Sequence, residues 1–94
     1  MQSFFETAID FADREEAQAL LGSRDEHLRL MADNFSCRFV SKGTGISLQG
    51  EEEEVKKALK VLQELQYLHR QGTQVTTHEV RYGIGLVKGG KAEA

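Results

Sequence analysis

"LLGSRDEHLRL", residues 20–30, joins two apolar patterns of helical spacing through a loop of the form Gly-x-x-Asp. A helix before the loop is predicted by Asp13 as N-cap and Glu16 three residues later, the pattern of a capping box, and it should end at Gly22. The apolar face of this helix consists of Ala17, Leu20 and Leu21. The pattern leaves open whether the loop holds the backbone of a nucleic acid or only turns the chain.

The helix after the loop has the same kind of start. Ser23 and Glu26 form a second capping-box pattern. Leu28, Met31 and Phe35 then recur at i, i+3 and i+7, which predicts one buried face. We therefore expect two short helices that meet at residues 22–25.

Three predicted strands flank the helical pair. The stretch FETAIDFAD, residues 5–13, alternates apolar and polar positions as a half-buried strand does. Its repeating face consists of Phe5, Thr7, Ile9 and Phe11. The segments CRFVSK and ISLQG, joined by a glycine-rich turn, predict a hairpin with Cys37 and Phe39 on one face of the first strand and Ile46 and Leu48 on one face of the second.

Two further helices are predicted after the hairpin. Residues 51–72 form the clearest amphipathic pattern, with acids in the first turn and Gly72 after the end. The apolar stripe of this helix consists of Val55, Ala58, Leu59, Leu62 and Leu65. A third capping-box pattern, Thr76 to Glu79, predicts a last helix, although Gly83 and Gly85 each cost about 1 kcal/mol relative to alanine in a helix. The apolar positions of that helix are Val80, Ile84 and Val87, and the final GGKAEA should fray.

Length, charge and cysteine content restrict the class of protein. Ninety-four residues suffice for one small domain, and the net charge of −3 gives no overall attraction to nucleic acid or to an anionic membrane. The only cysteine, Cys37, cannot form an internal disulfide, which fits a reducing cytosol. The first residues lack the basic region of a signal peptide, and no apolar run approaches the roughly 18 residues of a membrane span. We therefore expect a cytoplasmic protein without a membrane partner.

The element order predicts an α+β fold in which helices pack on one face of a three-stranded sheet, β-α-α-β-β-α, followed by a C-terminal helix. Three separated motifs carry a family resemblance: LLGSRDEHLRLM, GISLQGEEEEVKKALKVLQEL and QGTQVTTHEVRYGIGLVKGGK. Together they resemble the N-terminal domain of PhoH-family proteins over residues 7–91, and that domain is KH-like in fold. The resemblance implies a KH-like domain at residues 1–74 and, at residues 75–94, a C-terminal helix and frayed tail leading toward a P-loop ATPase domain outside this chain.

The resemblance also implies a candidate nucleic-acid site. KH domains hold single-stranded nucleic acid with a Gly-x-x-Gly loop between their first two helices. The matching residues here are Gly22, Ser23, Arg24 and Asp25, so an aspartate stands where the second glycine would be, and its carboxylate repels phosphate. A basic stripe beside the loop would consist of Arg24, Arg29, Arg38 and Lys42. The alternative is a helix-capping turn with surface charges.

No group of residues predicts catalysis, a metal site or a cofactor site. The stretch GLVKGGKA, residues 85–92, matches Gly-x4-Gly-Lys, but Ala92 stands where the hydroxyl that binds Mg²⁺ is needed. We therefore expect ATP and Mg²⁺ to bind only in the missing domain. His27, His69 and His78 fall on different elements, Cys37 is interpreted as a small core residue, and Glu51–Glu54 are interpreted as favourable charges at a helix start rather than as a metal site or a site for a basic partner.

Two functions follow as hypotheses. The first is a non-catalytic accessory domain of a PhoH-like ATPase that contacts single-stranded RNA and supports a role in RNA metabolism or in the phosphate-starvation response. The second is a protein-interaction or oligomerisation module, with its own ATPase domain or a second copy of the chain as partner. An apolar patch at Tyr67, Leu68 and Tyr82 would support the second, unless these residues only pack the last helix.

Overall fold

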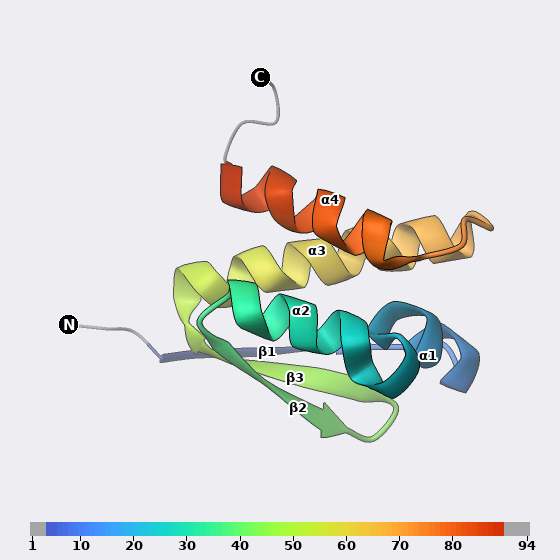
Figure 1. Ribbon diagram of the computed structural model, residues 1–94. Coiled ribbons are helices and arrows are strands. Elements are labelled where there is room, and N and C mark those ends of the chain that lie inside the picture. Colours follow the sequence, from blue (N-terminus) through green and yellow to red (C-terminus); the bar gives the residue numbers. More distant parts are fainter. Residues whose placement is uncertain (1–3, 90–94) are drawn as a thin grey trace.

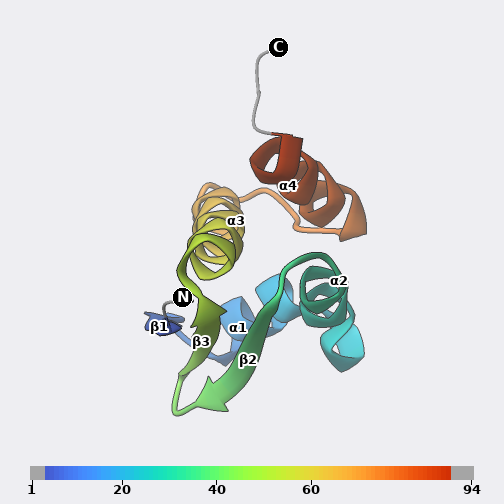
Figure 2. The ribbon, with the colours of Figure 1, turned by 90° about the vertical axis from the view of Figure 1, so that its left-hand side faces the viewer.

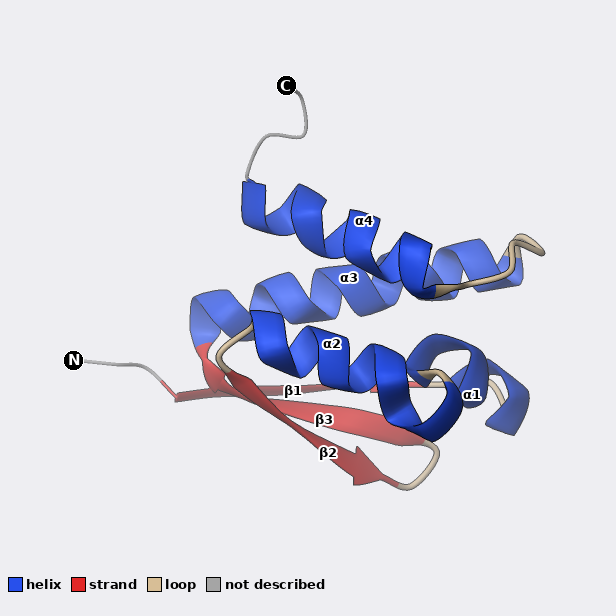
Figure 3. Ribbon diagram, viewed as in Figure 1, coloured by secondary structure: helices blue, strands red, loops and turns tan. Residues whose placement is uncertain are grey.

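The computed structural model describes residues 4–89, which form a three-stranded antiparallel sheet and a set of helices, so the predicted α+β class is confirmed (Figures 1 and 3). The elements in chain order are β1 (Phe4–Asp10), α1 (Arg14–Leu21), a 3₁₀ turn (Ser23–Asp25), α2 (Glu26–Asn34), β2 (Cys37–Lys42), β3 (Gly45–Glu51), α3 (Glu52–Arg70) and α4 (Thr77–Gly89). The predicted frayed tail lies outside the described residues from position 90 onward.

Strand β3, the last strand within residues 4–89, is the central strand of the sheet, whose order is β1-β3-β2. Strand β3 pairs antiparallel with both neighbours, and Leu48 is the register partner of Thr7 on β1 and of Phe39 on β2. A two-residue turn joins β2 to β3, because Lys42 and Gly45 are register partners. Gly45 is needed here, since a Cβ at this position would lie 2.2 Å from the Ile9 carbonyl oxygen.

All the helices lie on one side of the sheet, and α4 forms an outer layer against α3 (Figures 1 and 2). The core between the sheet and the helices takes Ile46 and Leu48 from β3, Leu20 from α1 and Met31 from α2. Helix α3 contributes five buried residues, Val55, Ala58, Val61, Leu62 and Leu65, so the predicted stripe is confirmed except that Val61 is buried and Leu59 only partly buried.

Helix α4 is part of the same core despite its glycines. Val80 and Ile84 are buried, and Gly83 is buried where a Cβ would lie 3.4 Å from the Val61 side chain. Packing against α3 therefore supplies the stability that propensity alone does not. Its predicted capping box is also confirmed: the Thr76 amide donates to a Glu79 carboxylate oxygen at 2.8 Å, and the Thr76 hydroxyl accepts from the His78 amide at 3.2 Å. The Thr76 hydroxyl also donates to this carboxylate, and that bond, together with the one from the Thr76 amide, lowers the pKa of Glu79.

Candidate nucleic-acid interface

The loop between α1 and α2 is a tight turn in which three residues have positive φ. The φ angles are 82° at Gly22, 54° at Arg24 and 58° at Asp25. The left-handed region costs a non-glycine residue about 1–2 kcal/mol, so the turn stores backbone strain at an exposed position. Asp25 therefore occupies a conformation that glycine adopts readily, as the second glycine of a Gly-x-x-Gly loop would.

The predicted capping box of the second helix is wrong. Helix α2 begins at Glu26 rather than directly after Ser23, its N-cap is Asp25, and no side chain bonds to its first amides. Backbone bonds close the turn instead, because the Asp25 amide donates to the Gly22 carbonyl and the Glu26 amide donates to the Ser23 carbonyl. Ser23 cannot act as an N-cap when the residue after it is left-handed, because the helix has not yet begun there.

Gly22 is required both by its backbone angle and by the space around it. A Cβ at this position would lie 2.8 Å from Cγ of His27. The His27 ring is buried beneath the turn, and its Nδ1 donates to the Leu20 carbonyl at 3.1 Å. His27 therefore joins the end of α1 to the start of α2, which explains this histidine without a metal or a catalytic role.

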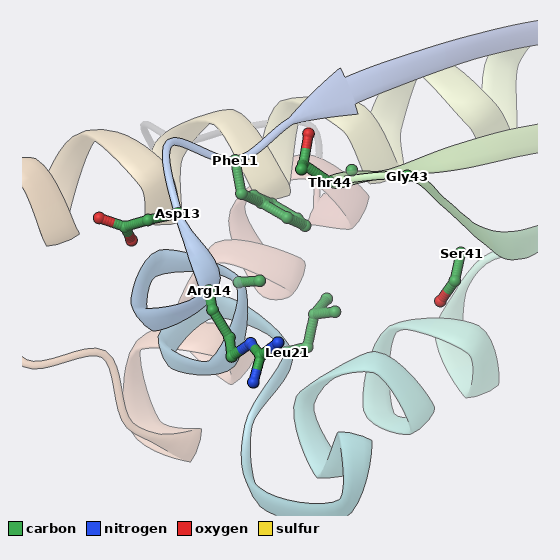
Figure 4. Close-up of a pocket in the computed structure, with 9 residues that line it drawn as sticks. Phe11, Asp13, Arg14, Leu21, Ser41, Gly43 and Thr44 are labelled. Atoms are coloured by element: carbon green, nitrogen blue, oxygen red, sulfur yellow. The ribbon is translucent and has the colours of Figure 1, made fainter.

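A groove of about 280 Å³ lies between α1 and the β2–β3 hairpin (Figure 4). Phe11, Ala17 and Leu21 supply its apolar lining, and Leu21 directly precedes Gly22. The opposite wall is formed by Ser41 at the end of β2 and by the hairpin turn and its flank, residues 43–45. The groove is thus an apolar space with polar backbone and hydroxyl groups along one side.

Arg14 is the cation that lines this groove, and the sequence interpretation missed it. Figure 4 shows its side chain running along α1 toward Leu21, whereas the Asp13 carboxylate points away from the groove. The signal was present, because Arg14, Ala17 and Leu21 recur at i, i+3 and i+7 and therefore share one face of α1. The capping-box pattern at Asp13 indicates only a helix start in this part of the sequence.

The structure divides the predicted basic stripe between two surfaces. Arg24 lies in the turn and Arg29 is exposed on α2, on the helical side of the sheet. Arg38 and Lys42 alternate along β2 with Cys37 and Phe39, which pack toward the core. The two cations therefore lie on the opposite, open face of the sheet.

An ion pair between a buried carboxylate, Glu16, and a half-exposed guanidinium, Arg70, fixes the start of α1, from which Arg14 projects. Glu16 is only 2% exposed and accepts from Arg70 of α3, with its Oε2 2.8 Å from Nε and its Oε1 3.0 Å from Nη2. Oε1 also accepts from the Ala12 amide at 2.7 Å and from Gln66 at 3.3 Å. The bond from Arg70 is the main cause that lowers the pKa of Glu16 to about 2, against the opposing effect of burial, so this carboxylate is ionised at neutral pH.

The remaining candidate residues do not form a second polar site. Burial and the nearby Glu54 raise the pKa of the Cys37 thiol to about 11, so it stays protonated and packs against the core. Within residues 4–89, no three His, Cys, Asp or Glu side chains lie close enough together to hold a metal ion. Glu54 accepts from the Ser36 amide at 2.8 Å, which gives this first-turn acid a structural role. The Gly-x4-Gly-Lys match begins inside α4, and its residues 90–92 lie outside the described part of the chain.

A second, more apolar groove of about 310 Å³ runs between α3 and α4. Leu65, Leu68 and Gly83 lie in it, and Tyr82 and Leu86 border it with exposed fractions of 65% and 38%. Tyr67 on α3 is also mostly exposed. The two tyrosines are therefore not used to pack the last helix. None of the described helices is long and apolar enough to cross a membrane.

The sheet topology, the strained turn and the adjoining groove define an α+β domain with a candidate ligand surface at the α1–α2 connection. The chain is 29% identical over 79 residues to a PhoH-like protein of Bacillus subtilis (strain 168), an alignment that covers 84% of this chain. This similarity supports a relationship with the PhoH family. The chain spans about a quarter of the length of that relative. No family model matches the chain, and no solved structure matches it.

Proposed function

We propose that this chain is a KH-like, non-catalytic domain that holds single-stranded RNA for a PhoH-like ATPase. The observation that carries the proposal is the groove between α1 and the hairpin, which is lined by Leu21, the residue before Gly22 (Figure 4). The β-α-α-β-β-α order of the elements supports the KH-like assignment, because the turn falls between the first two helices, where KH domains hold nucleic acid.

The groove and the turn offer complementary chemistry to an unpaired nucleotide. An apolar lining of Phe11, Ala17 and Leu21 suits the face of a base, and the hairpin wall offers polar groups to its edge. Arg14 and Arg24 are exposed beside the path that the sugar-phosphate backbone would take. Contacts of this kind are electrostatic, so binding should weaken as salt increases.

Asp25 sets the strength of this interaction. Its carboxylate lies in the turn itself and repels a phosphate that approaches the amides of residues 22–26. We therefore expect a weak contact, in which the domain positions RNA for the rest of a longer protein rather than capturing it alone. In this proposal ATP and Mg²⁺ bind to the ATPase part, the protein is cytoplasmic, and its role lies in RNA metabolism or in the phosphate-starvation response.

The test is an amide chemical-shift titration of the isolated chain with a mixed pool of single-stranded RNA oligonucleotides at low salt. Shifts should cluster at residues 11–29 and 41–45 and be lost in Arg14→Glu and Arg24→Glu. Arg81→Glu, an exposed change of the same charge on α4, is the control and should leave the shifts in place. Shifts that are absent, or that are equally weakened by the control variant, would refute the proposal.

Asp25→Gly supplies a gain-of-function arm. Glycine relieves the strain at φ 58° and removes the carboxylate, so RNA affinity should rise several-fold at low salt while the fold is retained. An unchanged or lower affinity in this variant would show that the turn does not contact the ligand.

A protein-interaction module is the second candidate function, and the apolar groove between α3 and α4 favours it. Exposed Tyr82 and Leu86 beside Leu68 form a surface of the kind that marks contact with another protein. Joining the domain to the ATPase part of a PhoH-like protein should then slow hydrogen exchange in α4. The slowing should disappear in Tyr82→Ser, and its absence in the unmutated chain would remove this candidate.

A further inference from the structure

We propose that the open face of the sheet binds the same face of a second copy of this chain. The helices all lie on the other side of the sheet, so this face is uncovered in the described part of the structure (Figures 1 and 2). Its outward residues on the two edge strands are Phe4, Glu6, Ala8 and Asp10 of β1 and Arg38, Val40 and Lys42 of β2, all of them exposed. The proposal is independent of the RNA site, which lies on the helical side.

On this face the acidic residues lie on one edge strand and the basic residues on the other. The acids Glu6 and Asp10 lie on β1, at one edge, and the bases Arg38 and Lys42 lie on β2, at the other edge. The central strand between them presents uncharged residues at the matching positions, Gln49, Ser47 and Gly45. We call Glu6 and Asp10 the acidic column and Arg38 and Lys42 the basic column. Two strand spacings, about 10 Å, separate the two columns.

The register makes this pattern complementary to itself. Glu6 and Arg38 share one partner on β3, Gln49, and Asp10 and Lys42 share Gly45, so each acid lies in the same cross-strand row as a base. When a second sheet packs face to face about a two-fold axis parallel to β3, its acidic column lies over the basic column of the first. Each row then brings Glu6 opposite Arg38 or Asp10 opposite Lys42, twice per dimer.

The middle of the face is suited to close approach. Ala8 and Ser47 are register partners with small side chains, and Ser47 is 2% exposed and donates its hydroxyl to Glu6 at 3.1 Å. Glu6 also accepts from Gln49 at 3.2 Å, so this acid is held in place on the face. Val40, 39% exposed, and Phe4, 73% exposed, add exposed apolar surface to this face.

The mixed charge favours a second copy over a nucleic acid on this face. A phosphate backbone would be attracted by Arg38 and Lys42 but repelled by Glu6 and Asp10 within about 10 Å, close to the Debye length at 0.1 M salt. Neither base forms an ion pair with a residue in the range 4–89. A ligand that forms ion pairs with both columns must itself carry positive and negative charges at the same spacing, as a second copy of this face does.

The expected dimer is weak. Three strands of up to seven residues present a face of roughly 14 by 23 Å, about 300 Å² in projection, which is well below the roughly 800 Å² per partner of a standard interface. A dissociation constant of about 0.1 mM is therefore the scale to look for, with strong weakening by salt.

The test is sedimentation equilibrium of the whole chain from about 10 µM to about 1 mM, in about 20 mM and about 500 mM salt. The unmutated chain should dimerise at low salt and lose at least about tenfold in affinity at high salt. Glu6→Lys with Asp10→Lys should be monomeric, as should Arg38→Glu with Lys42→Glu. Mixing these two double variants should restore a heterodimer, because every opposed pair is then again of opposite charge.

Controls separate this interface from general charge effects. Asp33→Lys with Glu64→Lys makes the same charge change as the β1 variant at exposed positions on α2 and α3, and it should leave dimerisation unchanged.

If circular dichroism shows that a double variant does not fold, the single variants Asp10→Lys and Lys42→Glu replace the double variants. Each single variant should weaken the dimer, and mixing the two should restore it. A monomer at 1 mM and low salt, or a mixture that stays monomeric, would overturn the proposal. Dimerisation that the β2 variant leaves intact while RNA binding falls would overturn it in favour of a nucleic-acid surface.

Discussion

The starts of α1 and α2 carry the same sequence pattern, but only α1 is capped by it. At α1 the Asp13 side chain accepts from the Glu16 amide at 2.9 Å. At α2 the corresponding Ser23 makes no such bond, and the chain passes through two left-handed residues before the helix begins. The start of α1 is therefore fixed by long-range contacts, whereas the start of α2 is strained and exposed to solvent.

The difference comes from contacts far along the chain. Glu16 is drawn inward by Arg70, which lies 54 residues later, and this contact aligns the first turn of α1 with the end of α3. Glu26 is exposed at the start of α2, and no distant residue in the range 4–89 forms an ion pair with it. The short turn must instead bring α2 alongside α1 so that the His27 ring of α2 reaches the Leu20 carbonyl, and left-handed residues achieve this at a cost in backbone energy. Strain that persists at an exposed turn supports a ligand-binding role there.

The largest expected effect on stability comes from removing the ion pair that holds the start of α1. Glu16→Ala removes the acceptor of Arg70, Gln66 and the Ala12 amide and should lower the free energy of unfolding by about 2–3 kcal/mol, less than for a fully buried pair because the Arg70 side chain is 54% exposed. Urea unfolding followed by circular dichroism measures this change. Glu15→Ala, an exposed neighbour in the same turn, is the matched control and should change stability by less than about 0.5 kcal/mol. Equal effects of the two variants would refute the assigned role of the ion pair.

The pH dependence of stability should show the same contact. Glu16 has its pKa lowered to about 2 from an ordinary value of 4.5, so its contribution is present above pH 4.5 and is lost as the pH falls toward 2. The difference in melting temperature between the unmutated chain and Glu16→Gln should therefore shrink steadily across that interval. A difference that stays constant from pH 5 to pH 2 would show that the carboxylate is not ionised through this contact.

The sequence predicted the helices and strands better than the contacts between distant segments. Local patterns indicated every strand and helix, because alternation on β1 and the apolar stripe of α3 depend only on residues close in the chain. The central position of β3 and the pairing of Glu16 with Arg70 depend on how distant segments meet, which a local pattern does not contain.

The candidate site was predicted in part for the same reason. The turn at Gly22 was located from its glycine, but the groove beside it needs the hairpin, residues 41–45, to lie against α1. Arg14 was missed because its pattern was interpreted only as a helix start. The separation of Arg38 from Arg24 could have been inferred, since Arg38 alternates on its strand with residues expected in the core.

A smaller effect should follow from removing the cap of α1. Asp13→Ala leaves the Glu16 amide without its acceptor and should lower the free energy of unfolding by about 1 kcal/mol. Asp13→Asn keeps an oxygen acceptor at the same place and should recover most of the loss. Urea unfolding of both variants tests this, and an equally large loss in Asp13→Asn would mean that the charge, and not the bond, stabilises the helix start.

The smallest effect is expected at the matching position of α2. Because Ser23 is exposed and makes no capping bond to α2, Ser23→Ala should change the free energy of unfolding by less than about 0.5 kcal/mol. The free energies of unfolding of Ser23→Ala and Asp13→Ala should be measured side by side. The sequence pattern alone predicts equal losses for the two variants, so the difference between them measures how differently the two helix starts are capped. A loss near that of Asp13→Ala would mean that Ser23 caps α2 in solution, and the turn would then be an ordinary helix start with no strain left to attribute to RNA.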